Sequence, residues 1–211
     1  MGAIYLIRHG QASFGAENYD ALSDLGGEQA RATGAELRKR GAVFSNVASG
    51  TLLRQRDTAR HAGYEPVADP RWNEYDFTDV IEHHGDPSAG YGDKASFQRI
   101  LDDALARWIT FRGPSPAAEA WSDFTARVDD AFSDLAREAN SGRSVAAFTS
   151  GGVIAAIAAR ALGSRDHIFV PLHRVSSNGG ITKLISGRSG ISLVSYNEHG
   201  HLDDGRLFSY R

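Results

Sequence analysis

The sequence predicts an α/β fold, a three-layer α/β/α sandwich whose central sheet is mostly parallel. Short, nearly all-apolar runs rich in β-forming residues recur along the chain, as is typical of strands buried on both faces. Segments with helical spacing of apolar residues separate these runs, and this alternation favours helices on both faces of one sheet. A chain of 211 residues is compatible with one large domain, so we expect residues 1–211 to form a single domain.

The first half of the chain predicts alternating strands and helices. Ala3–Ile7 is the first buried strand. Ser23 is suited to cap a helix that keeps its helical spacing of apolar residues until Gly41. The next elements expected are a strand at Val43–Ser49, a helix at Leu52–His61 and a short strand at Pro66–Ala68. Residues 69–93 are rich in proline, glycine and acidic turns, which predicts a long irregular loop over a site.

The second half continues the alternation. A helix is expected at Phe97–Phe111, and Pro114 and Pro116 follow it. A stripe of apolar residues predicts another helix packed on the core, made of Trp121, Phe124, Val128, Phe132 and Leu135. The remaining elements expected are a strand at Arg143–Thr149, a tight glycine turn at 150–152, an apolar helix at Val153–Leu162, and strands at Gly180–Ser186 and Gly190–Tyr196.

Composition excludes several classes of function. The formal net charge of -3 gives no globally basic surface for nucleic acid. No apolar run approaches the length of a membrane span, and nothing like a secretory leader precedes the first strand, so we expect a cytoplasmic protein without membrane association. The chain has no cysteine, which excludes sulfur-based zinc sites. The sequence leaves the oligomeric state open, with a homodimer as one option.

The first candidate site residues follow the first predicted strand, at Arg8-His9-Gly10. In open α/β sheets, ligands bind outside the carboxyl ends of the strands. A histidine there can attack a phosphoryl group, the adjacent arginine can hold phosphate oxygens, and glycine lets the backbone approach closely. A structural histidine at a strand end is the competing interpretation, and the triplet alone does not decide between the two.

Two further segments place suitable residues at other strand ends. Arg54 lies in the first turn of the helix after the second strand, where a helix N-terminus favours anions. A solvent-exposed helix arginine is the alternative, and it fits Arg56 equally. Glu74 follows the third strand in an aromatic setting, and partial burial of a carboxyl group suits a general acid. An ordinary acidic surface residue is the alternative there.

A strand, a glycine turn and a helix meet at Ser150-Gly151-Gly152. Backbone amides in such a turn can cradle an oxyanion, although an ordinary tight connection has the same pattern. Ser150 does not fit the nucleophile elbow, because that motif needs glycine two residues earlier and the residue there is Phe148. No Gly-x-Gly-x-x-Gly opens a helix and no Walker motif occurs, so a dinucleotide or nucleoside triphosphate site is not predicted.

Taken together, the four segments resemble the histidine phosphatase superfamily, also called the phosphoglycerate mutase-like family. The resemblance covers nearly the whole chain and rests on the order and spacing of the motifs. These are the Arg-His-Gly start, a Leu-Ser-x-Leu-Gly-x-x-Gln-Ala helix start at Leu22–Ala30 with an extra Gly27, the segment Ser49–Ala59, Asn73–Phe77, and the closing Gly-Gly-Val-Ile helix at 151–154. The resemblance implies a phosphoglycerate mutase-like fold.

The resemblance also implies a phosphatase that hydrolyses phosphate monoesters of small molecules without a metal or a cofactor. His9 is the implied nucleophile, which becomes phosphohistidine, and Glu74 is the implied acid and base. Arginines supply the positive charge that magnesium supplies in other phosphoryl-transfer enzymes. The implied phosphate-binding residues are Arg8, Arg54, Ser150 and Gly151.

Ser150 departs from the family pattern, which usually has a second histidine directly before the Gly-Gly of the last helix. A serine hydroxyl carries no charge, and losing one such donor costs on the order of 10²–10³ in rate. Three outcomes stay open: a slow enzyme, a site that binds a phosphorylated ligand without turnover, or another group in the missing role. The candidates for that role are His83, His84, His173, His199 and His201. Ser150→His should raise turnover, unless the site has been rebuilt around the serine.

A phosphoglycerate mutase is the alternative enzyme with the same fold. Mutases carry a longer, Asn-rich stretch with a tryptophan after Arg-His-Gly, whereas Gln11–Asp20 is compact and lacks tryptophan, so we rank the phosphatase first. Substrate contacts are expected from residues 69–93 and from the helices around 97–135. A partly aromatic pocket is expected from Tyr75, Phe77, His83, His84 and Tyr91, and it leaves open sugar, acid, nucleotide and peptide phosphates.

Overall fold

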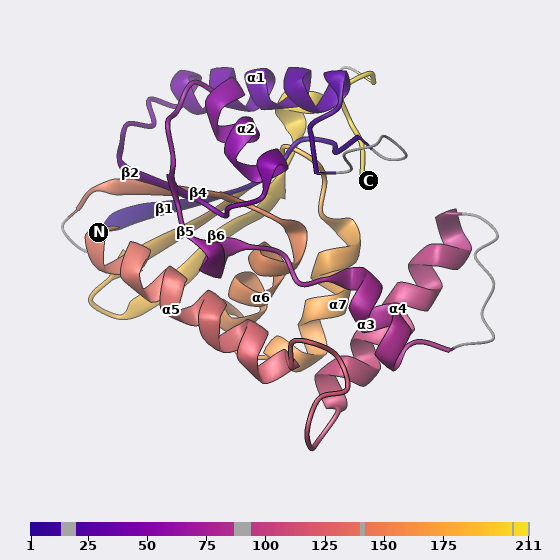
Figure 1. Cartoon of the computed structure of the whole chain (residues 1–211). Helices are drawn as coiled ribbons and strands as arrows, with labels where there is room; N and C mark the ends of the chain where they lie inside the picture. Colours follow the sequence, from indigo (N-terminus) through magenta and orange to yellow (C-terminus); the bar gives the residue numbers. More distant parts are fainter. Residues whose placement is uncertain (14–19, 87–93, 140–141, 204, 211) are drawn as a thin grey trace.

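The chain folds around a central sheet, shown in the computed structural model of Figure 1. The structure describes residues 1–13, 20–86, 94–139, 142–203 and 205–210. Within these residues a six-stranded sheet has the order β3-β2-β4-β1-β5-β6. The strands are β1 (Gly2–Arg8), β2 (Phe44–Ser49), β3 (Val67–Ala68), β4 (Ser144–Thr149), β5 (Ile181–Gly187) and β6 (Gly190–Glu198). Neighbouring strands from β3 to β1 are parallel, whereas β5 runs against β1 and β6.

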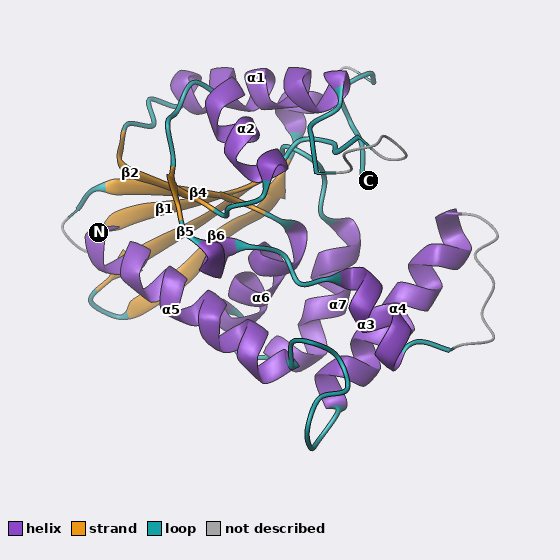
Figure 2. Cartoon of the chain, viewed as in Figure 1, coloured by secondary structure: helices purple, strands orange, loops and turns teal. Residues whose placement is uncertain are grey.

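Helices cover both faces of this sheet (Figure 2). One face carries α1 (Asp24–Lys39) and α2 (Leu53–His61), and the other carries α5 (Trp121–Ala139) and α6 (Gly151–Ala161). Beyond α6 lie α7 (Arg165–Val175), α4 (Lys94–Thr110) and α3 (Phe77–His84), which pack on one another in that order. Two short 3-10 turns complete these elements, η1 (Pro70–Trp72) and η2 (Gly200–Leu202). The predicted three-layer α/β/α architecture with a mostly parallel sheet is confirmed.

Side chains of β1 alternate between two apolar cores. Ile4 and Leu6 belong to the larger core under α5 and α6, while Tyr5 and Ile7 belong to the smaller core under α1 and α2. Successive residues of a strand point to opposite faces, so a strand covered on both sides has to be apolar at every position. This is the physical reason why the first strand could be predicted from an uninterrupted apolar run.

Two helix starts have different causes. Ser23 caps α1 as predicted, because its hydroxyl accepts a hydrogen bond from the Gly26 N–H at 3.1 Å. Helix α6 begins at Gly151, so the predicted tight turn is shorter than expected and its glycines already belong to the first helical turn. Every residue of α6 from Gly151 to Ala159 is buried, since the helix lies between the sheet and α7.

The long loop predicted at residues 69–93 is partly wrong. It contains η1 and the two-turn helix α3, whose start is capped by Asp76 through the N–H groups of Thr78 and Asp79 at 2.9 and 3.2 Å. Val80 and Ile81 are buried and anchor α3 on the larger core. The rest of the predicted loop, residues 87–93, lies outside the described residues.

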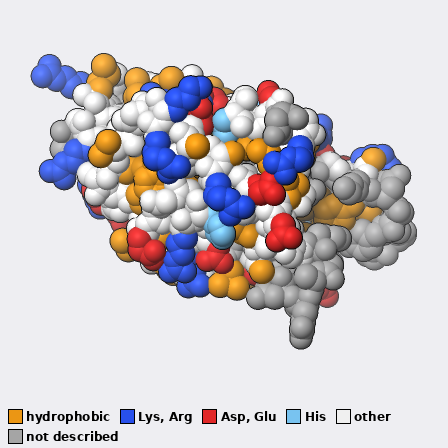
Figure 3. All heavy atoms as spheres, turned by 90° about the horizontal axis from the view of Figure 1, so that it is seen from above, with side chains coloured by type: hydrophobic (Ala, Val, Ile, Leu, Met, Phe, Trp, Pro, Cys, Tyr) orange, Lys and Arg blue, Asp and Glu red, His pale blue; other side chains and the backbone are white. Residues whose placement is uncertain are grey.

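Charged groups of both signs are interspersed on the face drawn in Figure 3, where no area of a single sign dominates the described surface. This distribution agrees with the small net charge of -3. None of the helices in the described parts of the chain combines the length and the apolar character needed to span a bilayer.

Candidate active site

Neighbouring parallel strands end at the same edge of the sheet. Arg8, the last residue of β1, pairs with Thr149, the last residue of β4, and the His9 N–H donates to the Thr149 carbonyl at 2.9 Å. Adjacent strands lie about 4.7–4.9 Å apart, so the residues that follow these two ends are neighbours. The fold therefore brings His9 and Ser150 side by side, although 140 residues separate them in the sequence.

The hydrogen bonds of the His9 ring fix its tautomer. Nδ1 lies 2.7 Å from the carbonyl oxygen of Gly10, and a carbonyl only accepts, so Nδ1 carries the ring proton. Nε2 accepts a hydrogen bond from Arg54 Nε at 3.2 Å, and a guanidinium only donates. Both contacts require a neutral imidazole with its lone pair on Nε2. That is the form in which histidine acts as a nucleophile.

Polar groups from other elements hold the backbone of His9 and Gly10. Thr58 Oγ1, on α2, accepts from the Gly10 N–H at 3.0 Å, and the amide of Asn178 donates to the His9 carbonyl at 3.2 Å. Asn178 is held in turn by Ser209, whose carbonyl accepts from the Asn178 N–H at 2.9 Å. The candidate nucleophile is thus set in a turn that is braced on both sides.

Gln29, which is fully buried on α1, extends this bracing. Its carbonyl oxygen accepts from the Gln11 N–H at 2.8 Å. Its amide nitrogen donates to the Leu207 carbonyl at 2.7 Å and to Ser209 Oγ at 2.8 Å. One amide therefore ties the turn after β1 to the segment 207–209.

Arg54 is directed towards His9 by a carboxylate from a distant part of the chain. Arg54 Nη1 donates to Asp20 Oδ1 at 2.5 Å, while the Leu53 N–H donates to Asp20 Oδ2 at 2.6 Å. Leu52, the residue at the N-cap position of α2, makes no side-chain cap. Asp20 therefore supplies both the missing cap and a negative charge at the N-terminus of α2.

Arg8 runs beside the first turn of α6. Its Nη1 donates to the Ser176 carbonyl, and a Cβ atom at Gly151 would lie 3.4 Å from Arg8 Nε. Ser176 Oγ is 2.9 Å from the hydroxyl of Tyr196, and burial raises the pKa of Tyr196 to about 12. The Ser176 carbonyl and the Tyr196 phenol are both uncharged at physiological pH, so neither of them neutralises the Arg8 guanidinium.

Glu74 reaches the same turn from the opposite side. Its Oε2 accepts from the Gly152 N–H at 2.8 Å, and its Oε1 accepts from the Tyr75 N–H at 3.3 Å. A Cβ atom at position 152 would lie 2.3 Å from Glu74 Oε1, which is closer than real Cβ contacts come. The lack of a side chain at Gly152 is therefore what admits the carboxylate.

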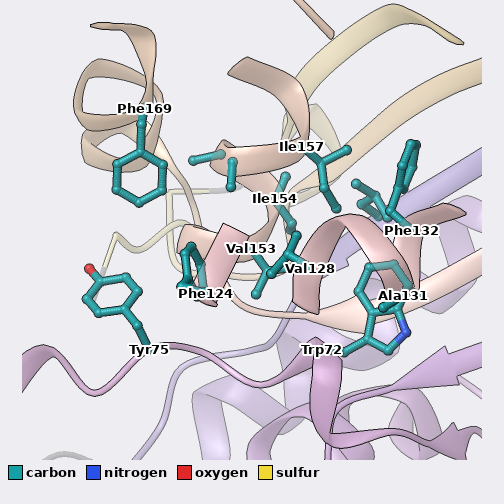
Figure 4. Close-up of a cluster of buried hydrophobic side chains, with 14 of the residues drawn as sticks. Trp72, Tyr75, Phe124, Val128, Ala131, Phe132, Val153, Ile154, Ile157 and Phe169 are labelled. Atoms are coloured by element: carbon teal, nitrogen blue, oxygen red, sulfur yellow. The ribbon is translucent and has the colours of Figure 1, made fainter. Parts of the chain in front are cut away.

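Aromatic packing anchors the segment that carries Glu74. Trp72 and Tyr75 flank it and are only 2% and 4% exposed. Figure 4 shows both side chains in the larger core together with Phe124. The Tyr75 ring lies 5.2 Å from that of Trp108, and its hydroxyl lies 3.3 Å from His173 Nε2. The aromatic setting predicted for Glu74 thus consists of Trp72 and Tyr75, whose packing in the core holds the segment that carries Glu74.

Comparison with known protein families agrees with this geometry. A family model described as the histidine phosphatase superfamily (branch 1) matches residues 4–199. The chain belongs to the histidine phosphatase superfamily. The family resemblance read from the sequence motifs is thereby confirmed.

Curated relatives of this histidine phosphatase superfamily chain include phosphoglycerate mutases. A 2,3-bisphosphoglycerate-dependent phosphoglycerate mutase from Sinorhizobium fredii is 28% identical over 149 residues, which cover 60% of this chain and 63% of that protein. The match therefore spans somewhat less than two thirds of that relative. A mutase of the same description from Allorhizobium ampelinum matches to the same extent, with 28% identity over 149 residues.

Solved structures of phosphatases share the fold over nearly the whole chain. A phosphoserine phosphatase from Entamoeba histolytica has a TM-score of 0.71 at 18% identity, and the match covers 96% of this chain and 100% of that one. A mycobacterial glucosyl-3-phosphoglycerate phosphatase has a TM-score of 0.65 at 24% identity, covering 95% of this chain and 100% of that one.

Ser150, the residue that departs from the pattern of the histidine phosphatase superfamily, is fully buried. Its hydroxyl oxygen accepts a hydrogen bond from Gln55 Nε2 at 2.7 Å, and Gln55 is fully buried as well. Ser150 occupies the N-cap position of α6 without making a side-chain cap. Its hydroxyl is therefore engaged by α2 rather than by the helix that it precedes.

The histidines considered as substitutes have separate settings. His173 is buried on α7, where it stacks on Phe169 and contacts Tyr75, the neighbour of Glu74. His201 lies in η2, with its Nε2 3.2 Å from the Gly179 carbonyl oxygen. His83 and His84 lie on α3, and the His199 ring packs 4.8 Å from that of Phe208.

Of the residues expected to line an aromatic pocket, Phe77 packs against Phe97, and Tyr91 lies outside the described residues.

Several polar residues of the site were not predicted from the sequence. Asp20, Gln55 and Asn178 each bind a candidate site residue, but the motifs assigned a role to none of them, although Gln55 lies within the segment Ser49–Ala59. The available signal was weak: Ser176-Ser177-Asn178 is a polar run that leads into a buried strand, and all three residues are buried. Buried polar groups need hydrogen-bond partners, so such a run points to a buried network.

Proposed function

We propose that this protein is a phosphatase that hydrolyses phosphate monoesters of small molecules through a phosphohistidine on His9. The observation that carries the proposal is the His9 ring, whose neutral tautomer holds its lone pair on Nε2 beside the Arg54 guanidinium. A cation at that position would attract the phosphoryl oxygens to the atom that attacks phosphorus.

The chemistry then takes two steps. Arg8, Arg54 and the first turn of α6 hold the phosphoryl oxygens while His9 Nε2 attacks phosphorus and the ester P–O bond breaks. Glu74, protonated at this stage, gives its proton to the leaving alkoxide. In the second step Glu74 takes a proton from water, the water oxygen attacks phosphorus, and the N–P bond breaks. Orthophosphate leaves, and His9 is again neutral.

His9→Ala tests this proposal directly. Wild-type protein is expected to release phosphate from an aryl phosphate and to give an acid-labile phosphoprotein after rapid quenching, whereas His9→Ala does neither. His61→Ala is a matched control, because His61 is an exposed histidine that contacts Arg31 on α1. Equal phosphate release by wild type and His9→Ala would contradict the proposal.

A phosphoglycerate mutase is the second candidate, because the curated relatives with 28% identity are described as such mutases. The compact segment Gln11–Asp20 favours the phosphatase, although residues 14–19 lie outside the described residues. Transfer of phosphate between the two positions of phosphoglycerate, faster than phosphate release, would decide for the mutase.

A protein that binds a phosphorylated ligand without turnover is the third candidate, and the uncharged Ser150 favours it. Calorimetric binding of a phosphorylated metabolite, with no phosphate released over hours, would support this candidate. Trapping of a labelled phosphohistidine on His9 would exclude it. A panel of phosphorylated metabolites, run with wild type and His9→Ala, serves all three candidates at once.

A further inference from the structure

Gln55 follows Arg54 on α2 and points into the protein towards the end of β4. Its Nε2 donates to Ser150 Oγ at 2.7 Å and to the Trp72 carbonyl at 3.2 Å. The second contact fixes the orientation of the amide, because a carbonyl oxygen can only accept and so must face the NH₂ group. The amide nitrogen therefore uses both of its protons, one for each partner.

This arrangement decides what the Ser150 hydroxyl can do. Ser150 Oγ accepts from Gln55, so its own proton has to be donated in another direction. The described residues provide no second hydrogen bond to this hydroxyl. Ser150 directly follows Thr149, and Thr149 pairs with Arg8, so the backbone of Ser150 lies next to the turn that carries His9. A phosphoryl oxygen bound beside His9 would be an acceptor for that proton.

The side-chain carbonyl oxygen of Gln55 lowers the stability of the native state. Gln55 Oε1 is buried and, among the described residues, has no hydrogen-bond partner. A Cβ atom at Gly50 would lie 1.9 Å from it, so the amide fits only because position 50 has no side chain. A buried carbonyl without a partner destabilises the native state, and an apolar side chain of similar shape would avoid that cost. Stability therefore does not explain a glutamine at this position.

We propose that Gln55 is a positioning residue, which holds Ser150 Oγ as an acceptor and thereby aims the Ser150 O–H at the transferring phosphoryl group. The inference rests on the proposed function, because it assigns Gln55 a part in the same site. In this view Ser150 and Gln55 together stand where relatives have a single histidine. Together, Gln55 and Ser150 supply one oriented hydrogen-bond donor that carries no charge.

A double-mutant cycle with Gln55→Met and Ser150→Ala tests the inference. Methionine has a similar length and no hydrogen-bonding amide, and the Trp72 carbonyl keeps Thr149 Oγ1 as a partner at 2.6 Å. Each single variant is expected to lower kcat on the order of 10²-fold, the lower end of the range for a lost uncharged donor. Because Gln55 acts through Ser150, the double variant should match Ser150→Ala within about twofold.

Thermal unfolding separates positioning from a structural role. Gln55→Met should melt close to the wild-type temperature, because the removal of the unpaired Oε1 offsets the loss of the hydrogen bond to Ser150, while its kcat falls. Losses that multiply in the double variant would overturn the inference, as would an unchanged kcat in Gln55→Met or a loss of kcat that follows a lower melting temperature.

The phosphatase proposal can fail separately. If wild type releases no phosphate, the same cycle is measured as the dissociation constant of orthophosphate by calorimetry. Non-additive losses of affinity would then support the pair in a binding site, and additive losses or none would overturn it. Retained phosphatase activity with additive kcat losses would leave the proposed function intact and reject only the role of Gln55.

Discussion

The Glu74 carboxylate packs so closely on Gly152 that no side chain fits at position 152. The Glu74 carboxylate rests on the Gly152 N–H, at a point where a Cβ atom would lie 2.3 Å from Oε1. Gly152→Ala is expected to push the carboxylate away and lower kcat on the order of 10²-fold, as for a displaced acid–base group. Steady-state kinetics with an aryl phosphate measures this effect.

Gly27→Ala is the matched control for Gly152→Ala. Gly27 lies inside α1, and a Cβ atom there meets nothing closer than Arg31 Nη1 at 3.6 Å. Alanine inside a helix should add about 0.5–1 kcal/mol to the free energy of unfolding and leave kcat unchanged. Equal activities of the two variants would show that the Glu74–Gly152 contact does not matter for turnover.

Ser150→His, which the family pattern alone predicts to be faster, meets an obstacle in the structure. The Ser150 hydroxyl oxygen lies 2.7 Å from Gln55 Nε2, so a histidine ring placed in the same direction would collide with the buried amide. We expect Ser150→His alone to lower the melting temperature without a gain in kcat. Gln55→Ala combined with Ser150→His should recover stability and raise kcat above that of wild type. A gain from Ser150→His alone would show that the ring finds another direction.

Candidate site residues could be predicted from the sequence where the neighbouring residues in the chain indicate the end of a strand or the start of a helix. His9 follows β1, Arg54 lies in the first turn of α2, and Glu74 lies between η1 and α3. Apolar runs and turn residues in the sequence indicate such positions between elements. Gln55 and Asn178 were missed because their partners lie 95 and 169 residues away in the sequence. Nothing near them in the chain records those contacts, so only the folded chain identifies them.

Helix α2 depends on a carboxylate from outside itself, which is a prediction at the scale of the element. Asp20 caps the Leu53 N–H and holds Arg54 at the same time. Asp20→Ala should lower the free energy of unfolding by about 1 kcal/mol, as for a lost N-cap, and should lower kcat because Arg54 is no longer directed. Urea unfolding and steady-state kinetics measure the two effects.

Asp57→Ala provides the comparison on the same helix. Its carboxylate pairs at the surface with Arg60 at 3.6 Å, and exposed pairs contribute little. We expect a change below about 0.5 kcal/mol and full activity. An Asp20→Ala variant no less stable than Asp57→Ala would mean that α2 does not need this cap.

Strands and helices could be predicted where one pattern of apolar residues extends over the whole element. The strands of the sheet centre were found because both of their faces are buried, which leaves uninterrupted apolar runs. Helix α3 has only eight residues, and Pro171 lies inside α7, so neither segment gives a clear helical signal. Their helical state comes from packing on α4 and α6, which a local pattern does not contain.

Stability of the whole molecule should fall as the solution becomes acidic. Burial lowers the pKa of His84 and of His201. An unfolded chain, whose histidines titrate near pH ~6.5, then takes up protons before the native state does. These two histidines therefore cost stability as the pH falls below about 6.5. The Arg71 hydrogen bond lowers the pKa of Asp69, which adds a further loss below about pH 4.

His201→Gln tests this pH dependence. The melting temperature of wild type should drop between pH 7 and pH 5, and the drop should be smaller in His201→Gln because no buried imidazole remains to be protonated there. His84→Gln should flatten the same curve independently, since His84 lies on α3, far from η2 in the sequence. Parallel curves for wild type and both variants would exclude these histidines as the cause.

The bracing of His9 by Asn178 and Ser209 has a consequence for the synthesis of the protein. The groups that hold the backbone of His9 leave the ribosome roughly 170 and 200 residues after His9 itself. Contacts between such distant parts of a chain form late and slow folding. A nascent chain can thus assemble the early strands and helices while its candidate nucleophile is still loosely held. Any reactivity of His9 towards phosphate esters would then arise only after residues 178–209 have been translated.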